Sequence, residues 1–118
     1  MQKAILSEQK RLCDQFKMEF SPVEEEQMVG VSKSFLERNL FPINGLRHSP
    51  EGIGSGWFFW AGGDEIPPDP KFFEPVHVKH LLEEFPEIVK YLALPPGARI
   101  QIDLVGYEDV WFDETLLK

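Results

Sequence analysis

His77 and His80 are the residues of this chain whose types and spacing come closest to a metal site. On a helix, side chains three positions apart share one face, so both imidazoles could approach the same ion. A protein-bound metal needs a third or fourth ligand with supporting hydrogen bonds. The glutamate and the four-residue spacing of a metalloprotease helix are also missing. We therefore expect no metal ion, and two partly exposed histidines on a short helix.

Paired carboxylates are the second candidate for chemistry. Neighbouring residues of a strand point to opposite faces, so an adjacent pair does not converge on one substrate. The chain has no nucleophile elbow, phosphate-binding loop or dinucleotide fingerprint, and the pattern places its one cysteine on the apolar face of a helix. A non-enzymatic protein without cofactors is predicted, and a small hydrolase using histidine and carboxylate groups is the least favoured alternative. The cysteine is Cys13, and the adjacent carboxylate pairs are Asp64/Glu65, Glu108/Asp109 and Asp113/Glu114.

Composition narrows the class of protein further. A chain of 118 residues with 42% hydrophobic content fits one globular domain, residues 1–118, and its single cysteine excludes an intramolecular disulfide. Its net charge of −8 argues against nucleic acid as a partner, because phosphate binding requires a basic surface. No secretory signal peptide and no apolar run of about 18 residues is found. We predict a cytoplasmic protein that does not insert into a membrane.

The element that must organise these residues is the aromatic segment 56–63 (GWFFWAGG). Aromatic side chains favour strands, and the flanking glycines bound the segment. Trp57 and Phe59 would then share one face of the strand, with Phe58 and Trp60 on the other. The pattern is typical of a central strand packed on both sides, although one tryptophan in an exposed binding face is an alternative.

The remaining pattern predicts an α+β fold: a mostly antiparallel sheet with an N-terminal helix and a central helical unit packed on it. Trp57, Phe59 and Trp111 are the predicted core aromatics. Asn44-Gly45 is read as a turn or bulge within an extended segment, and Pro75 as the first position of the helical unit. The predicted helices span residues 3–20, 34–39, 76–85 and 86–92, and the predicted strands 27–33, 41–48, 98–104 and 107–112.

Four short blocks of the sequence resemble a known family. They are residues 29–33 (VGVSK), 55–62 (SGWFFWAG), 94–97 (LPPG) and 109–113 (DVWFD), and the second block with Asp64-Glu65 is the most specific. The resemblance is to a bacterial domain family first catalogued without a function and later grouped with immunity proteins of polymorphic toxin systems. It covers about residues 28–113 and leaves the N-terminal helix and Glu24–Glu26 outside. It implies a small α+β protein that neutralises a toxin by binding it, and it supplies no catalytic residues.

Two surfaces are candidates for the contact with such a toxin. Asp64, Glu65 and Asp69 lie in a proline-rich segment that follows the aromatic strand, and carboxylates on a stiff loop suit a partner with a basic surface. The alternative is that this segment is only a solvated connection between elements. The second surface is the helix face that carries His77 and His80. An intracellular adaptor or small-ligand-binding module without catalytic activity is the alternative function.

Overall fold

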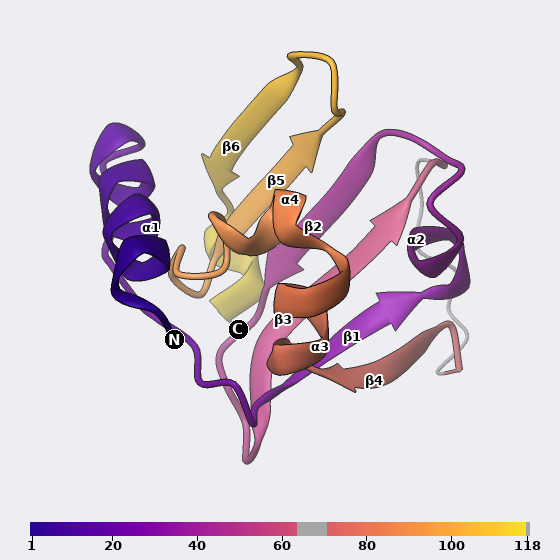
Figure 1. Cartoon of the computed structure of the whole chain (residues 1–118), viewed down its shortest axis with the longest axis horizontal. Helices are drawn as coiled ribbons and strands as arrows, with labels where there is room; N and C mark the ends of the chain where they lie inside the picture. The colour runs from indigo at the N-terminus through magenta and orange to yellow at the C-terminus, as the bar shows by residue number, and fades with distance from the viewer. Residues whose placement is uncertain (64–70, 118) are drawn as a thin grey trace.

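The computed structural model describes residues 1–63 and 71–117, and its fold is α+β, as the sequence predicts (Figure 1). One six-stranded sheet has the strand order β4-β1-β3-β2-β5-β6. Four of its five strand pairs are antiparallel, and β1 with β3 is the parallel pair. The elements in chain order are α1 (Lys3–Gln15), β1 (Met28–Ser32), α2 (Lys33–Glu37), β2 (Ile43–Arg47), β3 (Gly54–Ala61), β4 (Phe73–His77), α3 (Val78–Glu84), α4 (Pro86–Val89), β5 (Ala98–Ile102), β6 (Glu108–Phe112) and the 3-10 helix η1 (Glu114–Leu117).

The aromatic strand β3 lies inside the sheet, between β1 and β2, and its side chains divide between the two faces as predicted. Trp57 and Phe59 are 1% and 0% exposed, and they belong to the large core beneath α1, α3 and α4. Figure 1 shows α3 and α4 across this face of the sheet, which we call the helix face. Phe58 and Trp60 project from the opposite side, which we call the open face. The prediction of a central strand is therefore confirmed.

The prediction that Trp111 belongs to the buried core is wrong, because its side chain is 37% exposed. Trp111 pairs with Arg99, and Arg99 pairs with Leu46, so all three side chains lie on the open face. β6 is also the last strand in the sheet order, and it pairs with β5. Alternation along the strand therefore directs Trp111 away from the helices, which the local sequence does not reveal.

Two boundaries also differ from the sequence-based prediction. The segment around Pro75 and Val76 is not the start of a helix but the edge strand β4, and α3 begins at Val78. Val76 pairs with Val29 across the sheet, so cross-strand packing overrides the helical periodicity, and a proline is tolerated in an edge strand. Asn44 and Gly45 are not a turn but lie within β2, where Gly45 leaves room for the Phe59 ring: an added Cβ would meet its Cε1 at 2.6 Å.

The open face has a much smaller core than the helix face. Its buried cluster consists of Leu46, Trp60 and Leu116, and Leu116 comes from η1 near the end of the chain. Phe58 and Phe73 pack against this cluster but are only partly buried. Among the described residues, η1 is the helix that packs on this face, and the two rings stay partly in contact with water. Exposed apolar surface of this kind is found at binding sites.

Arg47 ties the helix layer to the sheet. Its side chain is 2% exposed, and its guanidinium donates hydrogen bonds to three backbone carbonyls, those of Ser21, Ser55 and Leu94, at 2.7–3.0 Å. No carboxylate pairs with it in the described part of the chain. Burial lowers the pKa of Arg47 to about 10. The cation is thus held by peptide carbonyls, which a planar group with five donors can satisfy, and it also lies 5.9 Å from the centre of the Trp57 ring.

Trp57→Ala tests the central-strand assignment. The variant removes the most deeply buried tryptophan and the hydrogen bond from its Nε1 to the Leu92 carbonyl (2.9 Å), so the free energy of unfolding should fall by about 3–5 kcal/mol. Trp111→Ala is the matched control and should lose less than half as much, because its side chain is 37% exposed. Urea unfolding followed by circular dichroism measures both. Similar losses in the two variants would contradict the assignment.

Arg47→Lys tests the role of the buried guanidinium. One ammonium cannot reach three divergent carbonyls, so we expect a loss of about 2–4 kcal/mol in the free energy of unfolding. Arg99→Lys is the control: Arg99 is partly exposed and forms an ion pair with the Asp113 carboxylate at 3.0 Å, so its variant should lose less than about 1 kcal/mol. Both values come from urea titrations at one pH. Equal losses would show that Arg47 is replaceable by any cation.

Candidate functional site

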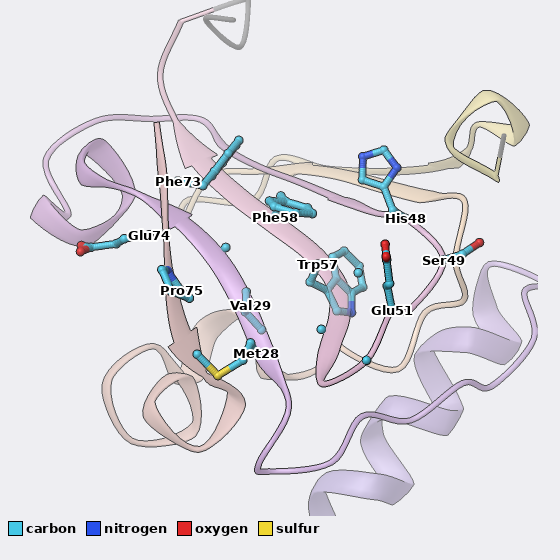
Figure 2. Close-up of a pocket in the computed structure, with 14 residues that line it drawn as sticks. Met28, Val29, His48, Ser49, Glu51, Trp57, Phe58, Phe73, Glu74 and Pro75 are labelled. Carbon is cyan, nitrogen blue, oxygen red and sulfur yellow. The ribbon is translucent and has the colours of Figure 1, made fainter. Parts of the chain in front are cut away.

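The open face carries a recess of about 600 Å³ between β1, β3, β4 and the segment 48–52 (Figure 2). We call it the glycine recess. A hollow of this size is within the range of ligand and side-chain binding sites. Its lining residues are Met28, Val29, Gly30, His48, Ser49, Glu51, Gly52, Gly54, Gly56, Trp57, Phe58, Phe73, Glu74 and Pro75.

Two glycines allow the walls of the recess to pack closely against the strands. An added Cβ on Gly30 would meet the Phe58 ring at 2.5 Å, so this glycine lets the ring lie flat against β1. Gly56 has a φ of +94°, and its added Cβ would lie 1.9 Å from the His48 carbonyl oxygen. Only glycine adopts that conformation in that space without strain. The sequence Val-Gly-Val and the sequence Ser-Gly-Trp thus shape the same hollow from two neighbouring strands.

The walls of the recess are aromatic and apolar. The Phe58 and Phe73 rings meet edge to face with centroids 5.1 Å apart. His48 approaches Phe58 from the other side at 5.7 Å, and its Nδ1 lies 3.2 Å from the Leu116 carbonyl oxygen of η1. These contacts hold the Phe58 ring between two neighbours, so the shape of the recess is set before any partner binds.

Glu51 gives the recess its charge. In Figure 2 its carboxylate points toward the recess near His48, whereas Glu74 points away from it on the opposite side. Glu51 forms no ion pair with any described residue, and the lining includes no lysine or arginine. The recess therefore combines apolar walls with one unpaired negative charge, which favours a ligand that is both apolar and cationic.

Hydrolytic chemistry has little support in this arrangement, although Ser49, His48 and Glu51 are close in sequence. A nucleophile must hydrogen-bond to its base, and the base to a third group that orients it. The His48 ring instead bonds the Leu116 carbonyl, and it bonds neither Ser49 nor Glu51. Burial, and then the charge of Asp14, raises the pKa of the Cys13 thiol, which suppresses the reactive thiolate.

The sequence-predicted contact residues fall in different places. Asp64, Glu65 and Asp69 lie outside the described residues. His77 is the last residue of β4 and His80 lies in α3, so they do not share one helix as predicted. Both line a hollow of about 520 Å³ with Glu25, Glu26, Lys79 and Glu83. Among residues 1–63 and 71–117, no group of three or more His, Cys, Asp or Glu side chains could hold a metal ion.

Sequence reasoning missed the residues of the glycine recess. His48 is the last residue of a segment predicted only as a strand, and Glu51 and Phe73 lie between the predicted elements. The available signal was the pair of strand glycines, Gly30 and Gly56, because a glycine inside a strand often marks a close approach. What the sequence could not show is that both glycines belong to strands that are adjacent in space.

The molecule is thus a small α+β protein whose sheet is covered on one face and hollowed on the other. A family model described as the Imm33-like domain matches residues 8–113. The chain therefore belongs to the Imm33-like domain family, a family of immunity proteins. The match begins at residue 8, so α1 from Glu8 onward and Glu24–Glu26 belong to the domain, which corrects the narrower extent expected from the sequence. No curated protein and no solved structure gave a match.

Within the described residues, none of the helices has the length and apolar character required to span a bilayer.

Gly30→Val tests whether this glycine sets the shape of the recess. The new side chain would overlap the Phe58 ring, which Phe73 and His48 hold in place, so we expect a loss of about 1–3 kcal/mol in the free energy of unfolding. Gly106→Val is the control, because nothing lies within 4 Å of its added Cβ and only its φ of +113° opposes a side chain. Aromatic NMR signals of Phe58 should shift in Gly30→Val alone. An unchanged Phe58 environment would contradict the packing described here.

Proposed function

We propose that this protein is a cytoplasmic immunity protein that neutralises a cognate toxin by stoichiometric, non-catalytic binding. The observation that carries the proposal is membership of the Imm33-like domain family across residues 8–113. An immunity protein of this kind acts by covering a functional surface of the toxin. Such a mechanism requires a preformed binding surface on a stable scaffold and no reactive group of its own.

Features of the fold support this function. The open face offers apolar surface and a recess with fixed walls, so little conformational entropy is lost when a partner binds. The chain carries 20 acidic and 12 basic residues. A net negative charge accelerates association with a basic partner and disfavours self-association. A toxin with a basic surface is therefore the partner that the charge distribution favours.

Two contact surfaces predicted from the sequence remain proposals beside the open face. One is the acidic segment with Asp64, Glu65 and Asp69, and the other is the surface around His77 and His80. The hollow at His77 and His80 also holds Glu25, Glu26 and Glu83, so its charge likewise suits a basic partner. Charge reversal in each set, tested against the toxin, distinguishes these surfaces from the open face.

A small-ligand-binding module is the alternative function, and the glycine recess is the observation that favours it. A volume of about 600 Å³ with mostly apolar walls is within the usual range for small-molecule sites. The two functions differ in their genetic context, because an immunity protein requires a toxin gene beside its own. A ligand-binding module has no such requirement.

Co-expression with the toxin encoded beside the gene tests the proposed function. We expect the toxin alone to stop growth, and co-expression of this protein to restore it. The purified pair should elute as a 1:1 complex in size-exclusion chromatography with light scattering. An equally acidic immunity protein of another family is the control and should give neither protection nor complex. Protection without a complex, or a complex without protection, would contradict neutralisation by binding.

A further inference from the structure

We propose that the glycine recess seats one large apolar side chain of the toxin, and that a lysine or arginine beside that side chain pairs with Glu51. The inference rests on the proposed function and specifies where the toxin is bound and by which chemistry. It assigns recognition to the open face and not to the helix face.

The walls of the recess determine what can be seated there. Phe58, Phe73 and Pro75 project onto the open face around Gly30, since Gly30 pairs with both Phe58 and Pro75 in the sheet. Because Gly30 has no side chain, the Phe58 ring lies directly over β1, where an added Cβ would meet it at 2.5 Å. The recess is the hollow that remains beside this ring. An aromatic or long aliphatic side chain entering this space would contact rings on two sides and exclude water from both.

Glu51 determines the charge of the occupant. Its carboxylate points toward the recess, has no ion-pair partner in the described chain, and faces no cationic residue in the lining. An apolar side chain alone would leave this carboxylate partly desolvated and unpaired, which is unfavourable. A cationic neighbour in the bound segment removes that cost and adds a charge-assisted hydrogen bond.

Other occupants fit these observations less well. A second copy of this chain also carries a net charge of −8, so the two copies would repel each other. The edge strand β6 also displays Trp111 and Phe112, but it carries the acidic residues Glu108 and Asp109 as well. It lies at the opposite edge of the sheet from β4, which borders the glycine recess. A free aromatic amine shares the chemistry of the proposed segment, and the experiment below separates it from the toxin.

Two substitutions at exposed positions test the two halves of the proposal. Pro75→Trp fills the recess from the edge strand, and Glu51→Lys reverses the charge at the recess; both wild-type residues are exposed, so the fold should tolerate the changes. Glu84→Trp is the control for bulk, because Glu84 is an exposed residue of α3 and is not among the residues that line the recess. Glu84→Lys on α3 is the control for charge reversal on the helix face.

Affinity for the toxin is measured by calorimetry at several salt concentrations. We expect Pro75→Trp to raise Kd by at least tenfold without changing its salt dependence. Glu51→Lys should raise Kd by a similar factor and reduce the dependence on salt. Both controls should stay within about threefold of the wild-type protein, as expected for exposed positions outside a contact.

Each of the other outcomes would overturn one part of the proposal. If the wild-type protein neither binds nor protects, the proposed function fails. If it binds the toxin but Pro75→Trp and Glu51→Lys bind equally well, the function stands and the recess proposal fails. If Glu51→Lys and Glu84→Lys raise Kd equally, the effect comes from the net charge of the protein, and the proposed pairing at Glu51 fails. If Pro75→Trp abolishes binding of phenethylamine but leaves toxin affinity unchanged, the recess is a small-ligand site and not the toxin contact.

Discussion

The structure depends on one buried cation, Arg47, which has no anionic partner among the described residues. Arg47 donates to the carbonyls of Ser21, Ser55 and Leu94, which belong to the segment after α1, to β3 and to the segment before β5. Its own carbonyl accepts from the Gly97 amide at 2.7 Å. A side chain that satisfies carbonyls from three distant segments fixes their mutual positions. Because burying an ion is costly, these bonds must all form together, which makes the packing of the helices on the sheet cooperative.

The same kind of contact recurs where the helices meet the turn before β5. Gln9 of α1 is fully buried and donates to the Val89 carbonyl at 2.8 Å, Cys13 approaches the Ala93 carbonyl at 3.4 Å, and Trp57 bonds the Leu92 carbonyl. Polar side chains thus bond backbone carbonyls of residues 89–93, which lie outside the strands of the sheet. The bonds from Gln9 and Trp57 to these carbonyls, like that from Arg47 to the Leu94 carbonyl, lie on the helix side of the sheet. The open face has donors of its own, since Gln101 donates to Asn44 Oδ1 at 2.9 Å and Arg99 pairs with Asp113.

The alternation of residues along the chain correctly predicted those features that depend on neighbouring residues alone. Strand alternation placed Trp57 and Phe59 on one face and Phe58 and Trp60 on the other, and the structure confirms it. β4 was misread because Val76 fits a helical repeat, whereas its pairing with Val29 is set by the tertiary fold. Trp111 was misplaced because burial depends on which sheet face a layer of helices covers. Arg47 and Gln9 look like surface residues in any window of sequence, and only the carbonyls they meet explain their burial.

The shape and the charge of the glycine recess come from different residues. Its shape is built into β1 and β3 through Gly30 and Gly56, where added side chains would collide with a ring or with backbone. Its charge comes from Glu51, an exposed residue between β2 and β3, where substitution disturbs no buried contact. A change at Glu51 can therefore alter which partner is accepted while the hollow persists. A change at Gly30 alters the hollow itself, and through the Phe58 ring it alters the packing of the open face. Recognition in this fold is thus adjustable at the loop and constrained at the strands.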